Sequence, residues 1–361
     1  MKRRDAIHVL VVDDSALMRR NLRAMLEGAG FDVSTAHNGQ HALDMIARVD
    51  PDVVTLDINM PVMDGLTCLS HIMVESPRPV VMVSSLTDRG ALATFEALEL
   101  GAVDYVSKPD GTVSLSIERV TDELVAKVNA AAGARSLGLS RRVTSQQSAA
   151  AFHQRSRVAH RPLPTRAEKG LVLIGVSTGG PRVLETILSQ LPAGLPWPVV
   201  IAQHMPKRFT RVFAERMDRY CQLEVREVSS PIPLEPGVAL IGKGDADVII
   251  GVRGGRRVAL CVPPDKSPWH PSVNRMVRSA MKHYKADHLI GVQLTGMGDD
   301  GAAAMAELHV QGGRTIAESE ESAVVYGMPR VLIEQGGATR ILHADQVAEQ
   351  LTAWLPTTPT H

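Results

Sequence analysis

The chain has 361 residues, of which 44% are hydrophobic and 22% charged, so it is long enough for two or three domains with packed cores. Its formal net charge is +0, which gives no general attraction to nucleic acid or to an anionic membrane. The sequence has no apolar run of about 18 residues, and the run Ile7–Val12 is too short for a signal peptide. We therefore expect a cytoplasmic protein without membrane insertion. The 3 cysteines are too scattered for a disulfide framework or a zinc cluster.

Short apolar runs alternate with helical patterns over roughly the first 125 residues, which is typical of βα units. A helix is predicted from Met18 to Leu26, and Gly28 and Gly30 end it. The clearest strand candidates are Ile7–Val12, Val53–Leu56, Val80–Val83 and Val103–Val106. Alternation at this spacing predicts a parallel sheet, and ligand sites on such sheets lie at the carboxyl ends of the strands.

Acidic residues follow two of these strands. Asp13 and Asp14 come after the first strand, and Asp57 comes after Val53–Leu56. Three carboxylates on one edge would repel one another, so we expect a divalent cation among them, and Mg²⁺ suits hard oxygen ligands. A carboxylate in such a site can act as a nucleophile toward a phosphoryl group. Lys108 follows a later strand and would reach the same edge. The alternative is that these acids are helix caps and surface charges.

Four motifs extend this pattern: VVDDS at 11–15, LDINMPVMDGL at 56–66, VSS at 83–85 and YVSKP at 105–109. Over residues 5–125 the chain resembles a response-regulator receiver domain. The resemblance implies a flavodoxin-like (CheY-like) fold with a five-stranded parallel sheet. It also implies that Asp57 is the phosphorylated residue and that Asp13, Asp14 and Asp57 hold Mg²⁺.

The same resemblance assigns the remaining polar residues of the receiver. Ser84 falls at the position of the switch hydroxyl, Tyr105 at that of the switch aromatic residue, and Lys108 at that of the lysine that senses the phosphoryl group. The phosphodonor it implies is a histidine kinase of the CheA type.

Residues 126–168 have a different composition. They are rich in Ala, Ser, Arg, Gln and Pro, and they lack a sustained apolar stripe. We expect a flexible basic linker here, because such a composition rarely packs into a core. A docking segment for an acidic partner is the alternative, and the sequence does not separate the two.

A second α/β pattern occupies residues 169–356. Its strand candidates are Leu171–Val176, Val199–Ala202, Val238–Ile241 and Leu289–Leu294. Helical segments lie between several of them. This pattern predicts a second parallel sheet in a doubly wound domain.

The first strand of this second domain runs into a glycine-rich turn. Gly175, Ser177 and Gly179 fit G-x-S-x-G, a turn that presents a serine hydroxyl at the end of a strand. Pro181 suits the first position of a helix. On its own the pattern leaves two interpretations open, a serine hydrolase and a phosphate-binding turn, because glycine-rich turns between a strand and a helix also bind phosphate.

A nucleophilic serine needs a base. His204 follows Val199–Ala202 and Asp300 follows Leu289–Leu294, so both can share one sheet edge with Ser177. Asp299 is the rival to Asp300, its plain interpretation being a turn residue. Four other histidines lack a strand end nearby and are interpreted as surface or structural residues: His270, His283, His288 and His309.

Four motifs of the second domain decide between these interpretations: IGVSTGG at 174–180, AQHMP at 202–206, LTGMGDDGA at 294–302 and YGMPR at 326–330. They resemble the catalytic domain of the chemotaxis protein-glutamate methylesterases, the CheB family. The resemblance implies that Ser177 is the nucleophile, His204 the base and Asp300 the residue that orients it. It also places Thr178 and Met297 in the active site, and the Met297 amide is our hypothesis for an oxyanion donor.

The activity implied by the resemblance is hydrolysis of glutamate methyl esters on methyl-accepting chemotaxis receptors, with release of methanol. Deamidation of receptor glutamines is implied as well. The hydrolase site would need no cofactor. In the family's arrangement the receiver covers this site until Asp57 is phosphorylated. Three alternatives remain: a response regulator that binds DNA, an esterase for small molecules, and a methylesterase that serves a receptor system other than motility.

Overall fold

The computed structural model describes residues 6–85, 87–108, 114–136 and 170–355. The chain divides into two compact units, Met1–His153 and Gln154–His361. Each unit contains its own parallel sheet, so each is an α/β domain with a separate core.

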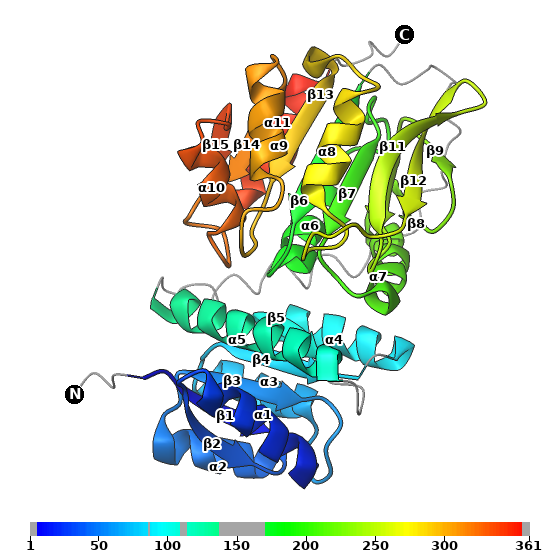
Figure 1. Ribbon diagram of the computed structural model, residues 1–361. Helices are drawn as coiled ribbons and strands as arrows, with labels where there is room; N and C mark the ends of the chain where they lie inside the picture. Colours follow the sequence, from blue (N-terminus) through cyan, green and yellow to red (C-terminus); the bar gives the residue numbers. More distant parts are fainter. Residues whose placement is uncertain (1–5, 86, 109–113, 137–169, 356–361) are drawn as a thin grey trace. The chain divides into compact units, whose positions relative to one another are not determined.

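The first unit is a five-stranded parallel sheet in the order β2-β1-β3-β4-β5 (Figure 1). Its strands are β1 (His8–Val12), β2 (Asp32–Ala36), β3 (Val53–Asp57), β4 (Val80–Ser84) and β5 (Asp104–Ser107). Its helices are α1 (Ala16–Gly28), α2 (Gly39–Val49), α3 (Gly65–Glu75), α4 (Asp88–Leu100) and α5 (Ser114–Ser136). The helix α1 packs against α5, and α3 packs against both α2 and α4, so two helical layers enclose the sheet.

The predicted strands of this unit are confirmed, and β2 is the strand that no apolar run indicated. The strands β1, β3 and β4 are buried along their whole length, as continuous apolar runs predict. The strand β2 lies at the edge of the sheet, and only two of its residues, Val33 and Ala36, are buried. An edge strand that is covered on one face needs few apolar residues, so its sequence lacks the continuous apolar run that would have predicted a strand.

The last helix of the first unit is longer than the sequence suggested. The helix α5 continues to Ser136, although we expected the linker to begin at residue 126. Leu124, Val128 and Ala131 are fully buried at the spacing of one helical face, so this stretch belongs to the core of the unit. The rest of the expected linker, residues 137–168, lies outside the described residues.

The second unit contains a seven-stranded parallel sheet in the order β15-β14-β13-β6-β7-β10-β8. Its strands are β6 (Leu171–Val176), β7 (Val199–Gln203), β8 (Glu224–Val228), β10 (Val238–Gly242), β13 (Leu289–Gln293), β14 (Arg314–Glu318) and β15 (Arg340–Leu342). A small antiparallel sheet consists of β9 (Ile232–Pro233), β11 (Asp247–Arg253) and β12 (Arg256–Val262). The four predicted strands of this domain are confirmed.

Helices cover both faces of the seven-stranded sheet (Figure 1). They are α6 (Gly180–Leu188), α7 (Lys207–Tyr220), α8 (Val273–Met281), the short 3₁₀ helix η3 (Ala286–His288), α9 (Ala302–Val310), α10 (Met328–Glu334) and α11 (Ala344–Trp354). The helix α6 packs against α7 and α11, whereas α9 packs against α8 and α10. This is the doubly wound arrangement that the sequence predicted.

The strand β6 lies at the centre of the sheet, between β13 and β7. Gly175 of β6 is in register with Ala202 of β7 and with Gln293 of β13. Because all three strands run parallel, their carboxyl ends lie side by side. The chain passes from β6 to one neighbour and later returns to the other, which is the point where open α/β sheets place their sites.

The environments of the three cysteines do not favour a reactive thiolate. Burial raises the pKa of the Cys68 thiol and that of the Cys221 thiol to about 12, so both stay protonated near neutral pH. Cys261 is partly buried, and burial raises its pKa as well. Their interpretation as core or surface residues is consistent with this environment.

Within the described ranges, the helices are all too short or too polar to cross a lipid bilayer.

The extended α5 helix leads to a stability prediction. Replacing Val128 by Ala removes buried apolar volume, so it should lower the free energy of unfolding of the first unit by about 2 kcal/mol. The matched control is Asn129→Ala, because Asn129 is exposed on the same turn and should cost less than about 0.5 kcal/mol. Thermal unfolding of the full chain measures both. Equal behaviour of the two variants would show that α5 ends near residue 125.

Candidate functional sites

Three carboxylates of the first unit converge at one edge of its sheet. Asp13 directly follows β1, and Asp57 is the last residue of β3. Both are almost completely buried, whereas Asp14 is exposed. One carboxylate oxygen from each of the three lies within 4.8 Å of the others. The structure therefore brings together the three acids that the sequence singled out.

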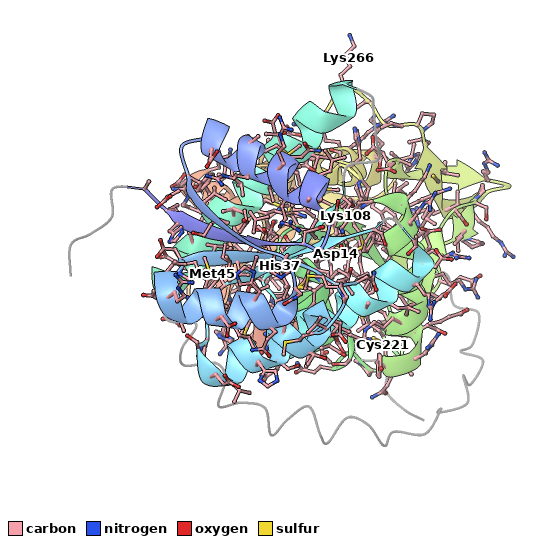
Figure 2. The ribbon with its side chains drawn as sticks, turned by 90° about the horizontal axis from the view of Figure 1, so that it is seen from below. Asp14, His37, Met45, Lys108, Cys221 and Lys266 are labelled. Carbon is pink, nitrogen blue, oxygen red and sulfur yellow. The ribbon has the colours of Figure 1, made fainter. Side chains whose placement is uncertain are left out.

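Lys108 completes this cluster. Its Nζ lies 2.9 Å from Asp13 Oδ2 and 2.8 Å from Asp57 Oδ2, so one ammonium bridges two buried carboxylates. Burial alone would lower the pKa of Lys108, but the hydrogen bonds to these two carboxylates raise it above its usual value. The side chain of Lys108 therefore stays protonated and positively charged. Figure 2 labels Asp14 and Lys108, which lie at the same end of the sheet.

Asp57 has an unusual electrostatic environment. Burial raises the pKa of its carboxyl, and the nearby Asp13 raises it further, against the lowering effect of Lys108 and of the Ile58 amide. A divalent cation would relieve this repulsion. The site offers three carboxylates at chelating distance and no softer ligand among them, so the residues fit Mg²⁺.

Ser84 and Tyr105 lie on the two strands beyond β3. Ser84 ends β4, is buried, and donates a weak hydrogen bond of 3.3 Å from Oγ to the carbonyl of Gly90. Tyr105 lies in β5 and is 3% exposed. Lys127 of α5 lies over its ring, with Nζ 4.9 Å from the ring centroid, and donates to the Tyr105 carbonyl at 2.6 Å. Tyr105 is thus packed inward, and its role as a switch stays a prediction.

In the second unit, Ser177 occupies the turn between β6 and α6. Its amide donates to the carbonyl of Thr295 at 2.9 Å, and its carbonyl accepts from Gln203 Nε2 at 3.0 Å. Gly179 has a φ of 77°, and a Cβ there would lie 2.6 Å from Val324. Only glycine suits this position, because the conformation is left-handed and no space remains for a side chain. Hydrogen bonds to Gln203 of β7 and to Thr295, which follows β13, thus fix the backbone of Ser177 on both sides.

His204 and Asp300 form a hydrogen-bonded pair. His204 Nε2 lies 2.9 Å from Asp300 Oδ2, and both side chains are less than 10% exposed, at 7% and 3%. The neighbouring Asp299 is exposed. Burial and hydrogen bonding therefore separate the two candidate aspartates, and it is Asp300 that reaches the histidine.

Asp300 is held by the N-terminus of α8. Its carboxylate accepts from the amide of Val273 at 2.7 Å, the amide of Asn274 at 3.0 Å and the hydroxyl of Ser272 at 3.1 Å. Burial would raise the pKa of this carboxyl, but the hydrogen bond and charge of His204 and these amides lower it below its usual value. Asp300 therefore stays ionised at neutral pH, which suits a residue that orients an imidazole.

The other ring nitrogen of His204, Nδ1, does not take part in the pairing with Asp300. Among the described residues, His204 Nδ1 is buried without a hydrogen-bond partner. The backbone amide of His204 donates to the carbonyl of Val176 at 3.1 Å, so the histidine lies beside the residue that precedes Ser177. The indole of Trp269 stacks on the imidazole, with ring centroids 5.4 Å apart and planes at 10°. One face of the imidazole is thereby covered.

The loop after β13 lies directly against the turn that carries Ser177. A Cβ on Gly296 would lie 2.7 Å from Ser177 Cβ, so the backbone of this loop touches the serine. Thr295 Oγ1 donates to the carbonyl of Thr178 at 2.9 Å and fixes the two segments together. Met297, the next residue of the loop, is partly exposed. Thr178 and Met297 therefore lie in segments that border Ser177.

Two family models match the chain: the response regulator receiver domain over residues 9–117 and CheB methylesterase over residues 172–351. A relative from Rhodospirillum rubrum, named protein-glutamate methylesterase/protein-glutamine glutaminase 3, is 56% identical across 97% of this chain and 96% of its own length. The chain belongs to the CheB methylesterase family.

Further similarities agree with this assignment. A methylesterase/glutaminase of Rhodopseudomonas palustris is 52% identical to this CheB methylesterase, over 96% of the present chain and 98% of the relative. The crystal structure of the catalytic domain of the Thermotoga maritima CheB methylesterase matches with a TM-score of 0.50 and 36% identity. That match covers 52% of this chain and 98% of the Thermotoga domain.

Several residues that shape the catalytic site of this CheB methylesterase were missed by sequence reasoning. Trp269 and Ser272 belong to a stretch that follows no strand of the main sheet. Ser272 precedes Val273 and Met276 at helical spacing, which is an N-cap signal that could have located the start of α8. Glu318 is fully buried and accepts from the amide of Thr295 at 2.7 Å, and no sequence pattern pointed to it.

The raised pKa of Asp57 leads to a stability prediction. When the pKa of a carboxyl is higher in the folded protein than in the unfolded chain, its contribution to the free energy of unfolding is fully present below the unfolded pKa. That contribution is lost as the pH rises through the folded pKa. At a pH above the folded pKa and without Mg²⁺ the ionised Asp57 is thus destabilising, so Asp57→Asn should raise the melting temperature of the receiver there by about 2–4 °C. The exposed Asp44 supplies the control Asp44→Asn, with no change expected.

The same variants report on the cation. Because Mg²⁺ binding stabilises the folded form, adding it should raise the melting temperature of the wild type and of Asp44→Asn, and should affect Asp57→Asn much less. A melting temperature that falls in Asp57→Asn, with Mg²⁺ response intact, would contradict both the electrostatic argument and the ligand set.

Proposed function

We propose that this CheB methylesterase hydrolyses glutamate methyl esters and deamidates glutamines on chemoreceptors, with Ser177 as nucleophile, His204 as base and Asp300 as the residue that orients the histidine. The supporting observation is the buried hydrogen bond between His204 and Asp300 at the sheet edge where β6 presents Ser177. The names of relatives that match nearly the whole chain support the same substrates.

The reaction begins at the serine hydroxyl. Ser177 Oγ attacks the ester carbonyl carbon while His204 Nδ1 takes its proton, giving a tetrahedral oxyanion and an imidazolium. The imidazolium then protonates the leaving methoxide, so methanol departs and an acyl-serine remains. Water, activated by the same nitrogen, releases glutamate. With a glutamine side chain the leaving group is ammonia, and the other steps are the same.

Two features favour the charges that develop. The ionised Asp300 accepts the Nε2–H of His204, which fixes the tautomer with Nδ1 free and stabilises the imidazolium. The oxyanion would be stabilised by the backbone amide of Met297, in the loop that touches Ser177, with Thr178 bordering the same space. The N-terminus of α6, which begins at Gly180, adds a favourable dipole.

The receiver supplies regulation. Asp57 is the proposed phosphoryl acceptor, and a CheA-type histidine kinase is the proposed donor in the cytoplasm. Asp13, Asp14 and Asp57 would hold Mg²⁺, which would screen the negative charge of an incoming phosphoryl group. Lys108 is placed to contact a phosphoryl oxygen, because its Nζ already lies 2.8 Å from Asp57 Oδ2. Ser84 would then move from its weak bond with Gly90 to the phosphoryl group.

Phosphorylation of Asp57 would raise the fraction of molecules with an accessible hydrolase site. The phosphoryl group carries about two negative charges and replaces the single charge of the Asp57 carboxylate, so the edge becomes more negative, which favours a rearrangement around Lys108, Ser84 and Tyr105. Control of the catalytic unit by this rearrangement would be a population shift, from molecules with a covered hydrolase site to molecules with an accessible one.

Methanol release from methylated receptor fragments tests the catalytic proposal. Ser177→Ala should lower the rate by roughly 10⁴-fold or more, because the nucleophile is lost. Ser189→Ala is the matched control, since Ser189 caps the C-terminus of the helix that follows the nucleophile turn. Equal release by wild type and Ser177→Ala would remove Ser177 from the mechanism. Absence of release from receptor fragments with rapid cleavage of small esters would favour a small-molecule esterase.

The regulatory proposal predicts a response to a small phosphodonor. With Mg²⁺ present, the phosphodonor should raise methanol release by wild type and by Asp44→Asn, and it should leave Asp57→Asn at its basal rate. The comparison is made on the full chain with the same receptor fragments. A phosphodonor effect that persists in Asp57→Asn would exclude this residue as the acceptor.

A further inference from the structure

One short stretch of chain holds both members of the His204–Asp300 pair. We call residues 269–274 the strap, which follows β12 in the chain and runs into the first turn of α8. Trp269 stacks on the imidazole of His204. Ser272, Val273 and Asn274 donate the hydrogen bonds that fix the carboxylate of Asp300. The position of the strap therefore sets the position of the pair.

A second buried carboxylate holds the strap itself. Asp247, the first residue of β11, is 1% exposed. Its Oδ1 accepts from His270 Nδ1 at 2.9 Å and from the amide of Ser272 at 2.7 Å. Its Oδ2 accepts from Arg275 Nη1 at 2.6 Å. His270 is next to Trp269, Ser272 is the N-cap of α8, and Arg275 lies in the first turn of α8. One carboxylate therefore fixes the strap at both of its ends.

Ser272 connects the two carboxylates directly. Its amide donates to Asp247 while its hydroxyl donates to Asp300 and also caps α8 by accepting from the amide of Arg275 at 3.3 Å. A displacement of the Ser272 backbone would therefore alter the hydrogen bonds of Asp300. Of the two carboxylates, Asp300 hydrogen-bonds to the imidazole, whereas the partners of Asp247 are His270, Ser272 and Arg275, so an effect of Asp247 on the reaction must travel through the strap.

The charge of Asp247 is already balanced by protein groups. Burial would raise the pKa of this carboxyl, but the hydrogen bonds from His270, Ser272 and Arg275 lower it, so it remains ionised. Asp247, the exposed Asp265 and His270 lie at chelating distance from one another. The oxygens of Asp247 are, however, already occupied by donors of the strap and of Arg275, which is unlike an open cation site.

We propose that Asp247 is a positioning residue for the proposed reaction: through Ser272 and the strap it holds Asp300 and Trp269 in the places where they orient His204. This inference rests on the proposed function of Ser177, His204 and Asp300. Asp247 makes its hydrogen bonds to His270, Ser272 and Arg275 and not to Ser177 or His204. It contributes by fixing the direction of the groups that donate to Asp300.

The test compares Asp247→Asn with wild type in the full chain. The substitution keeps the shape, but it removes the charge and places an amide group that cannot accept against Arg275. We expect kcat for methanol release to fall on the order of 10²-fold, because small misplacements of a catalytic group cost that much. KM should change by less than about threefold, since substrate contacts are left in place.

A destabilising substitution away from the strap is the matched control. Thr315 is fully buried in β14, where its hydroxyl bonds to the backbone of Gly337 and accepts from the amide of Thr339. Thr315→Val should lower the melting temperature of the unit without changing kcat. If Thr315→Val lowers kcat as much as Asp247→Asn does, the effect is general destabilisation and the proposal is wrong.

Two measurements that do not depend on turnover complete the test. The proton shared by His204 Nε2 and Asp300 should give a downfield NMR signal in wild type and Thr315→Val, and the signal should be lost or shifted in Asp247→Asn. The rate of Ser177 labelling by a fluorophosphonate should fall in parallel with kcat. An unchanged signal and labelling rate in Asp247→Asn would overturn the positioning role. Failure of wild type to be labelled would instead contradict the proposed function.

Discussion

The pairing of β6 between β7 and β13 is the constraint on which the catalytic unit depends. Parallel pairing in this register brings the residues after β6 and β7 to one edge, so Ser177 and His204 become neighbours through backbone geometry alone. Asp300 lies farther beyond its strand and must return along a tight loop. Glycine permits that loop, because Gly296 touches Ser177 and Gly301 adopts a φ of 96° where a side chain would meet Val273.

Buried charge is the second constraint, and the two units satisfy it differently. In the receiver, the side chain of Lys108 bridges Asp13 and Asp57, and the pKa of Asp57 remains raised. In the catalytic unit, oriented amides and hydroxyls surround Asp300, and its pKa is lowered. The first environment leaves a carboxylate whose charge is poorly compensated, and the second compensates it fully.

Sequence reasoning predicted the parts of this structure that are local. Continuous apolar runs located the buried strands, and residues directly after them located Asp13, Asp57, Ser177 and His204. The choice between Asp299 and Asp300 rested on a family resemblance, because adjacent identical residues differ only in burial. Asp247 could not be found in this way, since its partner Ser272 is far along the chain and neither residue shares a periodic pattern with the other. The helix α5 was underestimated because the Ala-rich stretch around Ala131 resembles linker composition, and its burial depends on the sheet.

The difference between the two charge environments bears on how such a chain can be regulated. The proposed phosphorylation of Asp57 would act on a carboxylate that burial and the neighbouring Asp13 already make costly to ionise. The proposed hydrolytic role of Asp300 needs donors that stay in place throughout the reaction, and the amides around this residue belong to a capped helix packed on β11. Because these requirements oppose each other, placing them on separate sheets lets each be met without weakening the other. A single α/β unit that carried both would have to move the same helix ends that its catalysis requires to be fixed.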